Sequence, residues 1–237
     1  MSENTKISWS EASWNPISGC SHASDGCGRC YAERITHRLQ RSPKTEKYRA
    51  GFDVVVTHPS TLGEPARLRR PTRIFVCSMA DLFHRDVPEV FIQQIFAVMN
   101  SLPQHQFQVL TKRSERMAEM APRLTWTPNI WAGVTVESPE YLHRLDDLRQ
   151  VPAAIRWISA EPLLSALPDL DLKGIHWVVA GGESGKIFRP MDPDWARGIR
   201  DQCARAGVAY FFKQYGGNKH GKGGDILDGV QHHEYPA

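Results

Sequence analysis

The chain has 237 residues, of which 41% are hydrophobic and 23% charged, with a formal net charge of +3. This composition is typical of a globular protein with one large core and excludes a chain too polar to fold. No apolar run reaches the length of a membrane span, and the polar start MSENTKISWSE lacks the apolar centre of a secretion signal. We therefore expect a cytoplasmic protein with reduced thiols and no membrane partner.

The first feature along the chain is a cysteine-rich segment. Cys20, Cys27 and Cys30 place three of the five cysteines within eleven residues, with the spacing C-x6-C-x2-C. An odd number of clustered cysteines does not predict a disulfide framework. Three thiols suit a metal centre that keeps one coordination position open, or a zinc site completed by His22, His37 or a distant residue. Glycines in the segment let backbone N–H groups turn toward the sulfurs.

Apolar runs rich in β-branched and aromatic residues then alternate with helical patterns. Predicted helices lie at 88–102, 138–150 and 192–207, and predicted strands at 13–17, 73–78, 107–111, 129–136, 154–160, 175–181 and 208–213. Strands that are apolar throughout and separated by helices predict a parallel sheet covered on both faces. We expect an α/β fold, a complete or partial parallel βα barrel, with a doubly wound open sheet as the alternative.

No linker or break in composition divides the chain, so we expect a single domain over residues 1–237. Two segments differ from the rest. Residues from about 41 to 73 are irregular and basic, and residues from about 216 to 237 are rich in Gly and His. Both are expected to be loops or appendages. Cys203 falls on the apolar side of the last predicted helix, so we expect it to be a buried hydrophobic residue.

The ends of the predicted strands carry the functional candidates, because function collects at the carboxyl ends of strands in parallel α/β folds. Nearly every strand here ends in a charged or hydrogen-bonding residue. Solvent exposure explains any one of them. It explains less well that Glu137, Glu161 and Glu183 each come one or two residues after a buried strand. The pattern therefore predicts a shared pocket at this end of the sheet.

These motifs resemble the radical S-adenosylmethionine (SAM) enzymes, in which a three-cysteine loop after the first strand of a βα barrel holds a 4Fe–4S cluster. More closely, the chain resembles a phage- and prophage-associated three-cysteine family related to that superfamily. The resemblance runs from Trp14 to about Gly217, through WNPISGC, CGRCYAER, FVCSMADLFH, FQVLTKR, SAEPLL, GGESG and FFKQYGG. It departs from the common superfamily pattern in its longer first cysteine gap and in a Gly-Gly-Glu on a late strand instead of the second.

The resemblance implies a radical SAM-like TIM-type barrel, a 4Fe–4S cluster on the three cysteines, SAM, and an electron donor such as flavodoxin or ferredoxin. Reductive cleavage of SAM would give a 5′-deoxyadenosyl radical that abstracts a hydrogen atom from the substrate. Candidates for contact with SAM are Tyr31, Ser78, Asp81, Glu137, Gly181 and Gly182. Catalytic candidates are Glu161, Glu183, Lys112 and Lys213, each of which could instead form a structural ion pair.

The substrate is inferred from charge and from the phage link. Basic stretches at 34–49 and 67–73 flank the cysteines, and they are either solvated faces or phosphate contacts. The phage link suggests a (hyper)modified pyrimidine in DNA or a nucleotide, which the radical would rearrange or modify. Predicted nucleic-acid contacts are Arg67, Arg69, Arg70 and Arg73.

Two other functions stay open at this point. One is a non-catalytic iron–sulfur or zinc protein that binds nucleic acid. The other is a photoproduct-lyase-like DNA repair enzyme, in which Cys77 could donate the hydrogen atom. The position of Cys77 inside a predicted strand favours burial instead.

Overall fold

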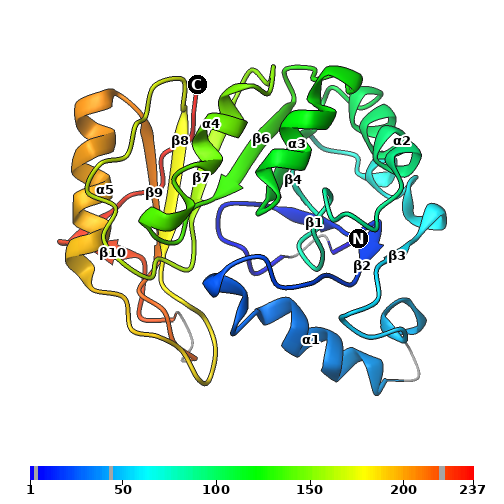
Figure 1. Cartoon of the computed structure of the whole chain (residues 1–237), viewed down its shortest axis with the longest axis horizontal. Coiled ribbons are helices and arrows are strands. Elements are labelled where there is room, and N and C mark those ends of the chain that lie inside the picture. The colour runs from blue at the N-terminus through cyan, green and yellow to red at the C-terminus, as the bar shows by residue number, and fades with distance from the viewer. Residues whose placement is uncertain (3–4, 43–44, 219–221) are drawn as a thin grey trace.

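The computed structural model describes residues 1–2, 5–42, 45–218 and 222–237, and its centre is one curved, wholly parallel sheet (Figure 1). Its strands follow the chain order without reversal: β1 (Ala12–Trp14), β4 (Arg73–Val76), β5 (Gln106–Thr111), β6 (Ile130–Thr135), β7 (Arg156–Ala160), β8 (Trp177–Gly181) and β9 (Ala209–Gln214). Each strand therefore neighbours the next in sequence, as in a barrel, and no strand-order reversal of a doubly wound sheet occurs. The predicted partial parallel βα barrel is confirmed.

Alternate strand residues serve two different cores, as the pleat requires. On β8, Trp177 and Val179 belong to an inner cluster, whereas Val178 and Ala180 belong to the outer cluster beneath the helices. The outer face is covered by α2 (Glu89–Asn100), α3 (Ser114–Met120), α4 (Arg144–Arg149) and α5 (Pro193–Ala206) (Figure 1). Burial on both faces explains why the strands are apolar throughout.

The predicted helices differ in how closely they match. The helices expected at 88–102 and 192–207 are confirmed, and Cys203 is fully buried on the inner side of α5. The pattern at 138–150 yields a 3-10 turn, Pro139–Tyr141, before the short α4. The helix α3 is missing from the sequence-based prediction, because seven residues give too few turns for a periodic pattern to stand out.

The inner face of the sheet is filled by aromatic rings. The cluster consists of Trp9, Phe75, Trp131, Trp157, Trp177, Val179 and Phe211. A Cβ on Gly133 would lie 2.4 Å from the Trp157 ring, so this glycine makes room for an indole. The barrel interior is therefore a packed core, and a ligand must bind at one of its ends.

Both edge strands are covered by the chain termini. Ser2 pairs with Ser13 of β1, and the C-terminal tail pairs with β9, where the Phe212 N–H donates to His232 O at 2.8 Å. Within the Gly/His-rich segment, β10 (Ile226–Leu227) and β11 (Val230–Gln231) form a small hairpin, and Leu227 is fully buried. This pairing leaves no free edge at these positions for another chain to join.

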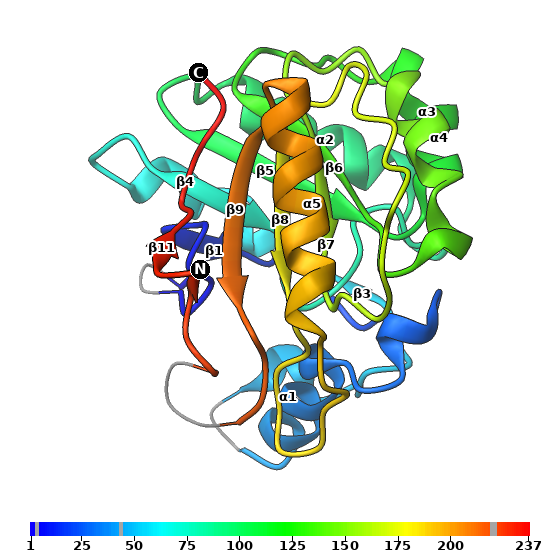
Figure 2. The same ribbon diagram turned by 90° about the vertical axis from the view of Figure 1, so that its left-hand side faces the viewer.

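The predicted strand at 13–17 is two strands, β1 and then β2 (Ile17–Ser18). β2 pairs antiparallel with β3 (Val56–Thr57), which comes from the basic segment 41–73. The helix α1 (Tyr31–Gln40) lies beyond the arrowhead of β9 (Figure 2), at the carboxyl end of the sheet. No helix in the described ranges combines the length and the apolarity that crossing a bilayer requires.

Candidate functional site

The cysteine loop, residues 20–30, lies at the carboxyl ends of the strands. It starts after β2, where Gly19 bridges to Ala80 beyond the end of β4. Gly19 has a φ of +83°, and a Cβ there would lie 2.0 Å from Val54 O, so only glycine fits. The Cys20 N–H donates to Phe52 O at 2.7 Å, and the loop ends at Cys30, the N-cap of α1. The basic segment 41–73 thus packs directly against the loop.

Each sulfur of the loop faces hydrogen-bond donors. Arg113 Nη1 lies 3.7 Å from Cys20 Sγ. The Ala23 N–H lies 3.5 Å from Cys27 Sγ, and Ser24 Oγ lies 3.7 Å from the same atom. The Cys30 thiol faces backbone N–H groups in the first turn of α1. Donors of this kind stabilise thiolates and tune the metals that thiolates bind.

The first and last thiols of the loop, Cys20 and Cys30, are protonated at neutral pH when no metal is bound. Burial, with smaller contributions from nearby Asp81 and Cys27, raises the pKa of Cys20 to about 12, although Arg113 acts in the opposite direction. Burial also raises the pKa of Cys30. A high pKa argues against a nucleophilic cysteine, because the thiolate is the reactive form. Metal coordination deprotonates a thiol outright, so these residues suit a ligand role.

Three thiols on one loop match the ligand number of a 4Fe–4S cluster that keeps one iron open, and also that of a zinc site completed by a further residue. Within the described part of the chain, no three or more Cys, His, Asp or Glu side chains converge as the ligands of a single metal ion. His22 and His37, the candidates for completing a zinc site, both face the carboxylate of Glu33. A 4Fe–4S cluster is ligated at separate irons, so its thiols need not converge on one point.

Glu137 anchors the middle of the loop. Its carboxylate has no solvent exposure and is paired with Lys112 and with Arg144, whose Nη1 lies 3.0 Å from Oε2. Ser24 Oγ donates to Oε1 at 2.5 Å, and a Cβ on Gly26 would lie 2.5 Å from the same oxygen. Burial raises the pKa of Glu137, but Lys112, Ser24 and Arg144 together hold it below the usual range. The carboxylate is therefore charged, and its oxygens are engaged in holding the loop.

Asp81 supports the start of the loop through Arg113. Its carboxylate is 6% exposed and accepts hydrogen bonds from Thr111 Oγ1 at 2.7 Å and from Arg113 Nη1 at 2.9 Å. The same guanidinium donates to Ser21 O at 2.9 Å and faces Cys20 Sγ. Asp81 thus orients an arginine toward a ligand sulfur. This geometry favours a positioning role for Asp81 over direct contact with SAM.

Glu183 joins the end of β8 to the loop. Its carboxylate is 4% exposed and is bound by the Arg189 guanidinium, while Arg29 Nη1 lies 3.6 Å away. Arg189 Nη1 also donates to Asp25 O at 3.1 Å. Burial raises the pKa of Glu183, but Arg189 and Arg29 hold it below its ordinary value. The late Gly-Gly-Glu therefore forms a structural connection between strand and loop.

Glu161 and Lys213 form an ion pair at the top of the aromatic core. Lys213 Nζ lies 2.7 Å from Glu161 Oε1, and Trp9 Nε1 donates to Glu161 Oε2 at 3.1 Å. Both charged side chains are partly exposed. A Cβ on Gly181 would lie 3.3 Å from Glu161 Oε1, so this glycine leaves space for the pair. Of the three glutamates, Glu161 has the fewest charged partners and remains most open to a ligand.

The remaining candidates for SAM contact lie on the same rim. Tyr31 follows the last cysteine, and its hydroxyl donates to Ser78 O at 2.5 Å. Burial raises the pKa of Tyr31, and Cys30 and Glu161 raise it further, so its phenol is neutral. A Cβ on Gly182 would lie 1.9 Å from Tyr215 O, so a close backbone approach requires this glycine. The structure thus brings the carboxyl-end candidates together around the loop, while their roles stay predictions.

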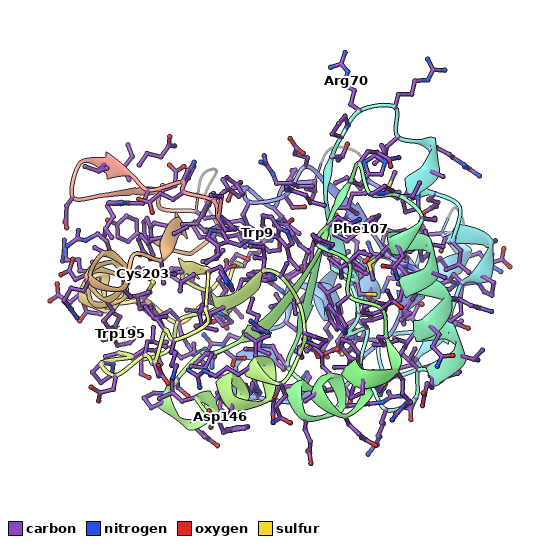
Figure 3. All side chains as sticks on the ribbon, turned by 90° about the horizontal axis from the view of Figure 1, so that it is seen from above. Trp9, Arg70, Phe107, Asp146, Trp195 and Cys203 are labelled. Carbon is purple, nitrogen blue, oxygen red and sulfur yellow. The ribbon has the colours of Figure 1, made fainter. Side chains whose placement is uncertain are left out.

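The predicted phosphate contacts lie elsewhere. Arg67, Arg69 and Arg70 precede β4, whose opposite end leads to Asp81 and the loop. Arg70 projects away from the body of the protein (Figure 3). Arg73 pairs with Glu11 at 3.4 Å and stacks over the Tyr235 ring. Arg67, Arg69 and Arg70 line a groove with Glu11 and Thr72 at the amino end of β4. The structure does not bring them to the cysteines.

Sequence reasoning missed the side chains that hold the loop in place. They are Ser24, Arg113, Arg144 and Arg189. Sequence reasoning also missed Trp9, which donates to Glu161, and Asn15, which accepts from the Met79 N–H. Arg113 stands in the quoted motif FQVLTKR, so its position after a strand was the available signal. Arg144 and Arg189 carry no such signal, because their contacts with the loop join residues that are distant in sequence.

Comparison with known proteins supports this architecture. A family model described as "Protein of unknown function (DUF5131)" matches residues 4–236. Among solved structures, spore photoproduct lyase complexed with dinucleoside spore photoproduct matches with 11% identity and a TM-score of 0.51. A cysteine-to-serine variant of that lyase matches with 13% identity and a TM-score of 0.52. In both cases 86% of this chain is covered, and it spans 64% of the length of the lyase. No curated protein matches. The likeness shows that this chain shares the fold of the lyase.

Proposed function

The chain belongs to the DUF5131 family, and from its lyase-like fold we propose that it is a radical SAM enzyme acting on a nucleotide unit of nucleic acid. One observation carries the enzyme class. Three thiols lie on one loop at the carboxyl rim of a parallel partial barrel, and each faces hydrogen-bond donors. This is the end of such a barrel where active sites form.

Cys20, Cys27 and Cys30 would hold a 4Fe–4S cluster, which together with SAM supplies a 5′-deoxyadenosyl radical after reduction by a donor of the flavodoxin or ferredoxin type. The residues of the chain fix the geometry around this centre. Glu137 holds the loop through Ser24, and Asp81 holds Arg113 against the first cysteine. The charge of each carboxylate is compensated by a neighbouring cation within the protein, so both residues position the centre.

The Glu161–Lys213 pair is the part of the rim suited to a substrate. Both groups keep some exposure, lie above the packed aromatic core and can exchange a proton with a bound ligand. The Trp9 N–H fixes one carboxylate oxygen of Glu161. Because the barrel interior is filled, a substrate must bind across this rim. A substrate bound there would shield the Glu161–Lys213 pair from water.

A nucleotide substrate is supported by the basic character of the chain and by the phage link of the family it resembles. The basic character favours phosphate groups in general. The choice of a modified pyrimidine in DNA rests on the resemblance to the phage-associated family. The solved lyase binds a dinucleoside photoproduct, which belongs to the same chemical class.

Repair of a photoproduct is the second candidate, and the fold similarity favours it. A hydrogen-donating cysteine would have to contact the substrate. Cys77 lies one residue after β4, at a φ of +62°, and is 2% exposed within the main core. Burial also raises the pKa of the Cys77 thiol above its ordinary value. This position favours modification of a base over a repair reaction that uses Cys77.

Metal analysis after anaerobic purification tests the proposal. Reconstituted protein should contain iron and acid-labile sulfide and should be brown, and the triple Cys20→Ala, Cys27→Ala, Cys30→Ala variant should be colourless. A Cys203→Ala variant serves as the control, since this thiol is fully buried in the helix core and should not affect iron content. Stoichiometric zinc without iron would contradict the proposal and favour a zinc protein that binds nucleic acid.

A further inference from the structure

The exposed face of α1 carries a row of arginines that begins beside the last cysteine. Arg34, Arg38 and Arg41 are four and three residues apart, so they share one helix face. The opposite face buries Ala32 and Thr36. Arg38 and Arg41 are exposed, and neither has an ion pair or side-chain hydrogen bond to any residue that the structure describes. Arg38 and Arg41 are therefore available to bind an anionic partner.

An apolar tip lies next to this row. The rim loop, residues 184–188, follows β8 and exposes Ile187 by 73% and Phe188 by 38%. Arg34 Nη2 donates to Ser184 O at 2.7 Å, which ties the rim loop to α1. A Cβ on Gly185 would lie 2.2 Å from Arg34 Nη1, so the glycine permits this contact. The loop is thus held in place while its tip remains open to solvent.

The tip also stands close to the cysteine loop. Arg189, directly after the rim loop, binds Glu183 and donates to Asp25 O at 3.1 Å. Large apolar side chains that remain exposed beside a candidate site indicate a surface that a partner covers. Here the neighbouring surface is cationic, so the partner must present both anionic groups and apolar faces. A nucleic-acid strand does so, because its phosphates are charged and its bases stack.

We propose that the α1 row and the tip of the rim loop form the binding surface for a DNA duplex from which one nucleotide is extruded. Arg38 and Arg41 contact phosphates, and Ile187 and Phe188 fill the space that the extruded base leaves, as apolar wedges do in other DNA complexes. This inference rests on the proposed nucleotide substrate. It places the phosphate contacts beside the cysteines instead of at Arg67–Arg73.

Salt dependence of binding tests the arginine row. The reconstituted full chain is mixed with a fluorescent duplex that carries a thymine mismatch, and anisotropy is measured across a series of KCl concentrations. Each lost phosphate contact lowers the slope of log K against log salt by ~0.9, so Arg38→Ser with Arg41→Ser should lower it by about 1.8. The control pair, Arg69→Ser with Arg70→Ser, removes the same charge at the amino end of β4 and should leave the slope unchanged.

A second variant tests the wedge. With 2-aminopurine beside the mismatch, binding should raise its emission as the base unstacks. Ile187→Ser with Phe188→Ser should abolish this rise and leave the salt slope unchanged. The control pair, Ile226→Ser with Val230→Ser, removes equally exposed apolar residues from the β10–β11 hairpin and should have no effect.

Several outcomes would overturn the inference. One is that the control arginine variant lowers the salt slope as much as the Arg38/Arg41 variant does, or that only the control variant lowers it. Another is that the rise in 2-aminopurine emission persists in the Ile187/Phe188 variant. Absence of DNA binding while 5′-deoxyadenosine forms with another substrate would refute this inference and leave the radical enzyme standing. The protein could instead bind DNA and show both variant effects but never assemble an iron–sulfur cluster. That result would refute the proposed enzyme class and leave this inference standing.

Discussion

Replacing Glu137 with Gln removes the charge that holds the cysteine loop and keeps the shape of the side chain. The native carboxylate is fully buried between Lys112, Arg144 and the Ser24 hydroxyl. Glutamine leaves both cations without a counter-charge. Its amide NH₂ group would also take the place of one carboxylate oxygen, so a donor would face the donors of Lys112 or Arg144. Arg144 is only 3% exposed and cannot recover hydration, whereas Lys112 is 20% exposed and can do so in part.

Removal of one partner from a buried ion pair costs about 3–5 kcal/mol. Because Lys112 regains some water, we expect a value near the lower end, about 3 kcal/mol of unfolding free energy. Urea unfolding followed by tryptophan fluorescence measures it. The control is Glu89→Gln, which breaks an exposed pair with Arg123 and should cost about 0–1 kcal/mol. A loss from Glu137→Gln no larger than the control's would refute the claim that this carboxylate anchors the loop.

Three further predictions concern packing, pH and catalysis. Gly133→Ala should cost ~1–3 kcal/mol in unfolding free energy, because its Cβ would meet the Trp157 ring, whereas Gly198→Ala meets nothing and should be neutral or stabilising. Burial, with Lys47 nearby, lowers the pKa of His58 to about 4. The unfolded chain binds this proton first, so stability should fall from about pH 6.5 toward pH 4, and titration of a His58→Gln variant should show a smaller fall. Glu161→Gln should lower turnover about 10²-fold with iron content unchanged, and equal turnover would exclude Glu161 from proton transfer.

The sheet was predictable because its signal is local. Each of the strands from β4 to β9 contains a short, mostly apolar run, and burial on both faces produces that pattern directly. The position of the cysteines at the carboxyl rim followed from their place after the first strand. The split of that strand into β1 and β2 did not, because it depends on pairing between β2 and the distant β3.

The roles of the charged rim residues were less predictable, because they depend on partners far along the chain. Sequence position alone made Glu137, Glu161 and Glu183 look equivalent. In the structure Glu183 is bound by two arginines and Glu137 by a lysine and an arginine, whereas Glu161 has one lysine partner. Charge compensation of this kind requires three-dimensional neighbours that no spacing rule supplies.

The same reason explains the basic segments. The run Arg67–Arg73 stands out in the sequence by its density of charge, yet it precedes β4 and so lies at the end of that strand away from the cysteines. The arginines of α1 are spread over a helix and look unremarkable in the sequence. Helical geometry gathers them on one face.

The central claim is that the three cysteines of the loop support reductive cleavage of SAM. The most direct measurement is anaerobic incubation of the reconstituted chain with SAM and a strong reductant, followed by quantification of 5′-deoxyadenosine by mass spectrometry. We predict formation of this product by the wild-type chain and by Cys203→Ala, and its loss in each of Cys20→Ala, Cys27→Ala and Cys30→Ala. Absence of 5′-deoxyadenosine from a wild-type chain that carries a complete 4Fe–4S cluster, with or without DNA, would contradict the account.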